Sequence, residues 1–182
     1  MKRFTRKHIN KTLFALFLAF VTLLVACESS PELLSNFEEP FRATVEGKVD
    51  GKEIKAEVFC DPTEHLTKEI YNVMTVTFSS PEALEGITVS LRSDGKATVR
   101  LKNTEEDLPL YDKLVEPYLA LMPGSEYASI EKSADGYKIA CEQNGGRFFY
   151  YFDVEGQPKS IEGKIFEREI RLNITKITKI NK

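Results

Sequence analysis

Residues 41–60, FRATVEGKVDGKEIKAEVFC, carry the pattern that decides the fold. Apolar side chains alternate with polar ones on both sides of Asp50-Gly51. Alternation is typical of a strand with one buried face, and Asp-Gly supplies the positive φ angles that a tight hairpin turn requires. The stretch therefore predicts a β-hairpin whose two strands turn their apolar side chains to the same face.

The same combination of alternation and turn residues recurs along the chain. Asp94-Gly95 lies between the alternating runs 87–91 and 97–101. Further turns are indicated by Asp135-Gly136, Asn144-Gly145-Gly146 and Glu155-Gly156. We therefore expect eight or nine antiparallel strands, each with one apolar face.

Two other stretches carry weaker patterns. Residues 160–177 are predicted to form one long strand, bent by a bulge between Ile165 and Ile170, where the alternation changes phase. Glu105-Glu106-Asp107 is expected to be a solvated loop, because nothing in its pattern places two carboxylates across a cleft.

Only one longer segment has helical periodicity. Between Leu108 and Met122, apolar residues recur every three or four positions, and Pro117 is expected to kink or split the helix. A second short helix is expected at 81–84. Because a single sheet cannot bury its apolar face alone, we expect it to curl around the helix. The predicted fold is mainly β (α+β): a single curved antiparallel sheet forming a half-barrel, with one or two helices plugging the concave side.

The connection after the strand at 73–79 resembles a known family. Residues 78–89, FSSPEALEGITV, are similar to the Phe-x-x-Pro-x-x-Leu-x-Gly-Ile/Leu-x-Val signature of the LolA-like fold, which includes bacterial lipoprotein and lipid carriers. The resemblance implies a half-barrel whose concave side is closed by helices and often holds acyl chains. The residues expected to line such a cavity are Val89, Leu91, Val99, Leu101, Leu114, Leu119, Met122 and Phe148.

The first 26 residues are predicted to be a lipoprotein signal peptide. Five basic residues and no acidic one accompany an apolar run of 14 residues, Leu13–Ala26, interrupted only by Thr22. The run is shorter than the roughly 20 residues that cross a bilayer and is typical of a secretory signal. It ends at Leu24-Val25-Ala26-Cys27, which resembles the lipobox of bacterial lipoproteins. That resemblance implies lipidation of Cys27; a short membrane anchor with an incidental cysteine is the alternative.

The rest of the chain divides into a tether at 27–40 and a domain at 41–182. Residues 27–182 hold 20 basic and 28 acidic side chains, a net charge near −8. Such an acidic domain argues against nucleic acid as a partner, because binding to phosphates depends on Lys and Arg. The expected location is the extracytoplasmic face of a bacterial membrane, through the lipid on Cys27.

The sequence offers no convincing set of catalytic or metal-binding residues. His65 is the only histidine after the predicted signal, whereas hydrolases usually need a histidine base and catalytic zinc usually takes two or more histidine ligands. The stretch from Cys60 to His65 is better explained by the turn chemistry of Asp61-Pro62 than by a metal site. We expect neither an enzyme, a metal nor a cofactor.

Cys60 and Cys141 are the pair that remains once Cys27 is lipidated. Both occupy apolar positions of expected strands. A disulfide suits an exported protein, and a buried free cysteine behaves as a small apolar residue. The sequence leaves both alternatives open.

Five consecutive aromatic residues, Phe148–Phe152, place rings on both faces of one strand. If Phe148 faces the interior, Phe149 and Tyr151 lie on the outer face. They form either a patch for a partner or a surface covered by another segment.

Three classes of function remain to be weighed, and an enzyme is the least expected of them. The main prediction is a non-catalytic lipoprotein that acts by binding a protein. Size, lipobox and fold resemble the clostridial spore-germination lipoproteins, and this implies a peptidoglycan amidase as partner and the forespore or spore envelope as location. The alternative is a carrier that binds acyl-chain lipid or lipoproteins in the half-barrel. The edges of an open sheet also offer a route to a homodimer.

Overall fold

The structure is a computed structural model that describes residues 31–63, 69–101, 104–107, 112–123, 127–143 and 146–180. Internal contacts divide the chain after Pro31, and Glu32–Lys182 form one compact unit. The predicted signal peptide and Cys27 lie outside the described residues. No helix among the described residues is long and apolar enough to cross a membrane.

Eleven strands in the described ranges form a single sheet, and every neighbouring pair is antiparallel. The strands are β1 (Phe41–Val49), β2 (Lys52–Cys60), β3 (Asn72–Ser80), β4 (Ile87–Arg92), β5 (Ala97–Leu101), β6 (Thr104–Asp107), β7 (Tyr127–Ser133), β8 (Gly136–Gln143), β9 (Gly146–Phe152), β10 (Pro158–Ile165) and β11 (Arg168–Lys179). The prediction of a mainly β, single open antiparallel sheet is confirmed.

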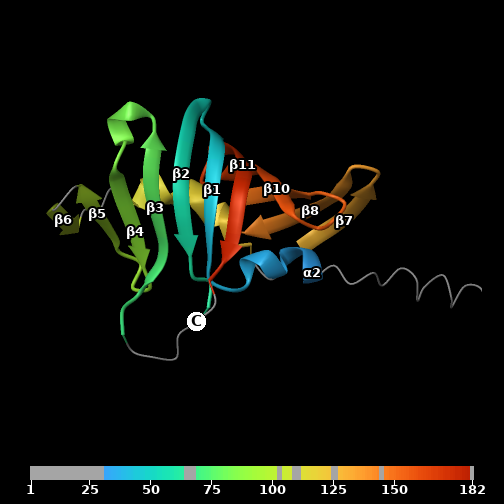
Figure 1. The fold of residues 1–182 in the computed structure, drawn as a ribbon, viewed down its shortest axis with the longest axis horizontal. Coiled ribbons are helices and arrows are strands. Elements are labelled where there is room, and N and C mark those ends of the chain that lie inside the picture. Colours follow the sequence, from blue (N-terminus) through green and yellow to red (C-terminus); the bar gives the residue numbers. More distant parts are fainter. Residues whose placement is uncertain are drawn as a thin grey trace, which may run out of the picture. The chain divides into compact units, whose positions relative to one another are not determined.

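The strand order is β6-β5-β4-β3-β2-β1-β11-β10-β9-β8-β7. The chain thus builds one meander outward from β1 to β6 and a second from β7 back to β11. The last strand then pairs with the first, and Figure 1 shows β1 and β11 side by side between the two meanders. The β1–β11 pair is therefore the seam that makes one sheet from two meanders.

The turns that contain Asp-Gly lie where the sequence predicts them. Asp50 and Gly51 have φ angles of 50° and 75° between β1 and β2, and Gly95 has a φ of 79° between β4 and β5. These are left-handed conformations, which Gly and Asp adopt at low cost.

The prediction of one long strand over 160–177 is wrong. The chain reverses at Phe166 and Glu167, which have φ angles of 43° and 69°, and β10 pairs with β11 from Ile165↔Arg168 onward. The apparent change of phase is therefore a two-residue hairpin rather than a bulge. Phe and Glu are not residues that mark positive φ, so the turn carries no local signal in the sequence.

Two strands were not expected from the sequence. The acidic stretch predicted as a loop forms β6, which pairs with β5, and β7 pairs with β8. Both lie at an edge of the sheet. Edge strands pair on one side only and are commonly short or charged, so they show little apolar alternation.

Helical segments are short. The described helices are α2 (Pro31–Leu34), η1 (Ser35–Phe37), η2 (Glu82–Leu84), α3 (Asp112–Val115) and η3 (Glu116–Leu121), the η segments being 3-10 helices. The helix expected over 108–122 is thus divided, in its described part, just before Pro117. Proline lacks the amide hydrogen of a regular helix, which explains the change to a tighter helix there.

The segment formed by α3 and η3, called the plug below, connects the two edges of the sheet. Because β6 and β7 lie at opposite edges, the chain between them has to pass over one face of the sheet. The plug contacts β3 and β4 through α3 and β10 through η3. Its residues Val115, Tyr118, Ala120 and Leu121 are buried in the same core as the inward side chains of the strands.

Tyr150 on β9 joins the plug to the rest of this core. Its side chain is 1% exposed, and its hydroxyl donates a hydrogen bond of 2.8 Å to the carbonyl oxygen of Ala120. Its ring also lies 6.1 Å from that of Phe37, which the segment before β1 places on the same side of the sheet. Leu34 and Phe37, in the predicted tether, therefore belong to the core.

Gly47 allows the two meanders to approach closely at the seam. A Cβ atom at this position would stand only 1.9 Å from the carbonyl oxygen of Arg171 on β11. No side chain fits at such a distance from backbone, so glycine is required for β1 and β11 to approach this closely here.

We predict that Gly47→Ala destabilises the protein by about 1–3 kcal/mol, the usual cost of overpacking. Lys48→Ala, at the exposed neighbouring position, is the control and should change the free energy of unfolding by less than about 0.5 kcal/mol. Chemical denaturation measures both variants. Equal stability of the two would show that the seam tolerates a side chain.

We also predict that Tyr150→Phe costs about 1–3 kcal/mol, because it leaves the buried carbonyl of Ala120 without its donor. Tyr151→Phe, on the half-buried outer position of the same strand, should leave the unfolding midpoint unchanged. A Tyr150→Phe variant as stable as the parent chain would contradict a role of this bond in holding the plug.

Candidate functional site

The concave side is covered unevenly by the plug. Val89 and Val99, which pair across β4 and β5, are buried. Leu101 lies two residues after Val99 and so faces the same side, yet it is 49% exposed. Its cross-strand partner Ile87 and the next inward residue of β4, Leu91, are only half-buried. Apolar surface thus remains accessible at Ile87, Leu91 and Leu101, on the concave side of β4 and β5.

The plug contributes apolar surface that is also only partly covered. Leu114, Leu119 and Met122 pack against the core but remain half-buried. α3, which carries Leu114, contacts β4, whereas η3, which carries Leu119, contacts β10. We call the following residues the apolar rim: Ile87, Leu91, Leu101, Leu114, Leu119 and Met122.

The residues expected to line a cavity differ in burial and in position: some lie partly exposed in the rim, two are buried on β4 and β5, and one is buried on a distant strand. Leu91, Leu101, Leu114, Leu119 and Met122 belong to the rim, and Val89 and Val99 lie buried beneath it. Phe148 is buried on β9, and five strands separate β9 from β4 in the sheet. Ile87 was not among the expected lining residues, although its place in the alternation of β4 would have indicated it.

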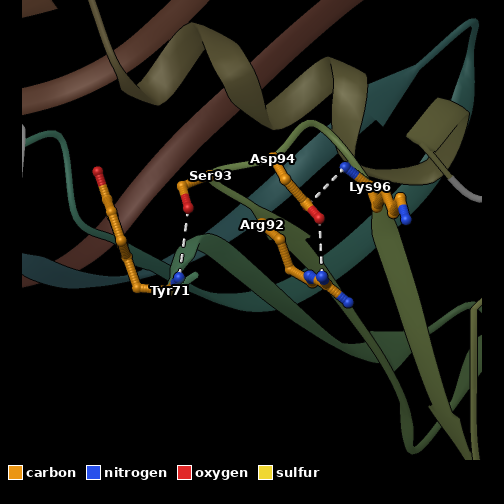
Figure 2. Close-up of polar contacts among 5 residues, drawn as sticks. All are labelled: Tyr71, Arg92, Ser93, Asp94 and Lys96. Atoms are coloured by element: carbon orange, nitrogen blue, oxygen red, sulfur yellow. Dashed lines mark hydrogen bonds and ion pairs between the residues drawn. The ribbon is translucent and has the colours of Figure 1, made fainter. Parts of the chain in front are cut away.

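A set of polar contacts fixes the hairpin that carries half of the rim (Figure 2). The carboxylate of Asp94 accepts hydrogen bonds from the side chain of Arg92 at 2.7 Å and from the backbone amide of Lys96 at 3.2 Å. Ser93 accepts a hydrogen bond from the amide of Tyr71 at 3.3 Å and donates its own amide to the Tyr71 carbonyl at 2.8 Å. The β4–β5 turn is therefore tied to Tyr71, the residue before β3.

Tyr118 is the most unusual residue of the plug. Its side chain is 1% exposed, and its ring packs edge-on against Phe78 of β3 with 6.0 Å between the ring centroids. Its hydroxyl is buried but has no hydrogen-bond partner in the described structure. Burial raises the pKa of this phenol well above its ordinary value, and the positive charge of Arg168 opposes part of that rise.

Arg168 begins β11, directly after the β10–β11 turn, and connects this turn to the plug and to the β1–β2 turn. Its Nε lies 2.8 Å from the carboxylate of Asp50 in the β1–β2 turn, and its guanidinium donates to the carbonyl of Lys113 in α3 at 2.7 Å. The hydrogen bond from Arg168 is the main cause of a lowered pKa for Asp50. The side chain of Arg168 thus holds the β1–β2 turn, the β10–β11 turn and α3 together.

Cys60 and Cys141 are both buried and both free in the structure. Cys60 ends β2 and Cys141 lies in β8, with four strands between them in the sheet. Burial raises the pKa of the Cys141 thiol to about 11 and that of Cys60 further. Thiols with such pKa values are poor nucleophiles near neutral pH, so they act here as small apolar side chains.

Phe149 and Tyr151 are half-buried on the face of β9 opposite to the core. The Nζ of Lys138 lies 4.6 Å and the Cζ of Arg147 5.3 Å from the centre of the Phe149 ring. Phe149 also lines an open groove of about 530 Å³ on this outer face. The groove is lined by Lys48, Gly51, Arg147, Phe149, Glu162, Gly163, Lys164, Glu169, Ile170 and Arg171.

The stretch from Cys60 to His65 is described only as far as Thr63. There the buried carboxylate of Asp61 accepts hydrogen bonds from the amide and the hydroxyl of Thr63, as in an Asx turn. Glu64 and His65 lie outside the described residues. Within the described ranges, no three acidic, histidine or cysteine side chains gather in a way that could hold a metal ion.

No family model and no curated protein matches the chain. Its structure is similar to that of an uncharacterized conserved protein from Thermus thermophilus, with a TM-score of 0.48 and 16% identity over 85% of this chain and 90% of that one. A LolA superfamily protein from Nitrosomonas europaea gives a TM-score of 0.43 and 11% identity over 83% of this chain and 93% of that chain. A putative outer membrane lipoprotein-sorting protein domain from Vibrio parahaemolyticus gives a TM-score of 0.39 and 7% identity over 81% and 89% of the two chains.

Proposed function

We propose that the concave side binds an acyl chain, and that the protein is a non-catalytic carrier or holder of lipids or lipoproteins in the cell envelope. The observation that carries this proposal is the apolar rim. Leu101 and Ile87 face the concave side but lack the cover that Val89 and Val99 have. Exposed apolar surface is costly in water at roughly 25 cal/mol per Å², and an apolar ligand laid along the rim would remove it.

The short helices of the plug favour the binding of apolar ligands that differ in length. Three of the rim residues, Leu114, Leu119 and Met122, belong to a segment built from one short α-helix and a 3-10 helix. Such a segment covers less of the sheet than a regular helix of several turns would. Met and Leu side chains adapt their shape readily to an irregular apolar surface. The resemblance of residues 78–89 to the LolA-like signature agrees with this use of the concave side.

The proposed location is the outer face of a membrane, where lipid substrates are at hand. It depends on the predicted lipid at Cys27, which lies outside the described residues. A double acyl anchor would hold the chain at the membrane durably. The protein would then accept or hand over acyl chains locally rather than travel between membranes.

The amidase partner expected from the spore-germination resemblance stays a prediction. No contact among the described residues favours an amidase over other proteins, and the free apolar surface of the rim is better explained by an acyl chain. The same holds for a homodimer through the edges β6 and β7.

The proposal predicts that a photoactivatable palmitate bearing a diazirine labels the plug and the β4–β5 hairpin. The full chain is reconstituted in lipid nanodiscs, illuminated with the probe, and the labelled peptides are quantified by mass spectrometry. Leu101→Glu should lower the labelling several-fold, because it places a charge in the path of the chain.

Val154→Glu is the matched control, since Val154 is 63% exposed and lies between β9 and β10, in the other meander from Leu101. It should leave the labelling unchanged. Labelling that is equal in the parent, Leu101→Glu and Val154→Glu chains would refute acyl binding at the rim.

A further inference from the structure

Tyr118 and Tyr150 form a natural comparison within one core. Both side chains are 1% exposed and both belong to the concave side. The Tyr150 hydroxyl donates to the Ala120 carbonyl, whereas the Tyr118 hydroxyl finds no acceptor in the described structure. Leaving a buried hydroxyl unpaired costs about 1–3 kcal/mol. Phenylalanine at position 118 would fill the same space without that cost.

The surroundings of Tyr118 define what could satisfy its hydroxyl. The ring is fixed by Phe78 of β3, and its chain neighbours Leu114, Leu119 and Met122 belong to the apolar rim. The positive charge of Arg168, which is itself paired with the carboxylate of Asp50, also acts to lower the pKa of this hydroxyl. Tyr118 thus places one buried hydrogen-bond donor on the same segment as partly covered apolar side chains. This combination suits the polar end of a chain that is otherwise hydrocarbon.

We infer that the Tyr118 hydroxyl donates a hydrogen bond to an acyl oxygen of the bound lipid, so that the site recognises fatty acyl groups rather than hydrocarbon in general. This inference rests on the proposed function. The acceptor is either the carboxylate of a free fatty acid or the carbonyl of an acyl ester.

The test compares three diazirine probes of equal chain length on the full chain in nanodiscs: palmitate, methyl palmitate and a hexadecane that has no acyl oxygen. Tyr118→Phe should raise the palmitate concentration that gives half-maximal labelling about tenfold. This is the effect expected from losing one hydrogen bond to a charged group. Labelling by the hexadecane probe should not change. An effect on both acyl probes identifies the carbonyl as the acceptor, and an effect on palmitate alone identifies the carboxylate.

The unfolding midpoint provides the control for structure. Tyr118→Phe should raise the midpoint of the ligand-free chain, because it removes the cost of a buried unpaired hydroxyl and breaks no bond within the protein, whereas Tyr150→Phe should lower it. A midpoint that falls in Tyr118→Phe as it does in Tyr150→Phe would show a partner within the protein and overturn the inference.

Two further outcomes separate this inference from the proposed function. If the parent chain is labelled at the rim but Tyr118→Phe affects all three probes equally or none of them, the hydroxyl does not recognise the ligand and only the inference fails. If no probe labels the rim of the parent chain, both the proposed function and the inference fail.

Discussion

The structure depends on one constraint: a single sheet with one apolar face has to be covered by its own chain. The two meanders end at opposite edges, β6 and β7, so the chain that joins them crosses the face that needs cover. The plug is therefore a consequence of the topology as much as of its own helical pattern. Its attachment is specific, because the Tyr150 hydroxyl meets the carbonyl of Ala120 in the buried interior. Without the plug, the inward side chains of β3, β4 and β10 would face water.

The seam between β1 and β11 joins the two meanders through a close approach of their backbones. At Gly47 the backbone of β11 occupies the place of a side chain. Next to the seam, Arg168 joins the β1–β2 turn to α3, so the strands that form the seam also hold the plug in position.

The sequence predicts those parts of the fold that carry a local physical signal. Asp50-Gly51 and Asp94-Gly95 indicate their hairpins because only a few residue types adopt positive φ cheaply. Phe166 and Glu167 adopt the same conformation without such a signal, because the pairing of β10 with β11 imposes it. The rim could be predicted in part, since Leu91, Leu114, Leu119 and Met122 follow the strand and helix periodicities. The exposure of Leu101 and the unpaired hydroxyl of Tyr118 could not, because both depend on how far the plug reaches over the sheet.

The incomplete cover of the concave side leaves two kinds of group in an unfavourable state. The rim exposes apolar side chains to water, whereas the hydroxyl of Tyr118 is buried away from water without a hydrogen-bond partner in the described structure. A purely apolar ligand would relieve only the first, and a small polar molecule only the second. A fatty acyl group relieves both, because it joins a hydrocarbon chain to an oxygen acceptor in one molecule. Tyr118 and half of the rim residues belong to the plug, and this favours a ligand that enters along the rim and ends at Tyr118.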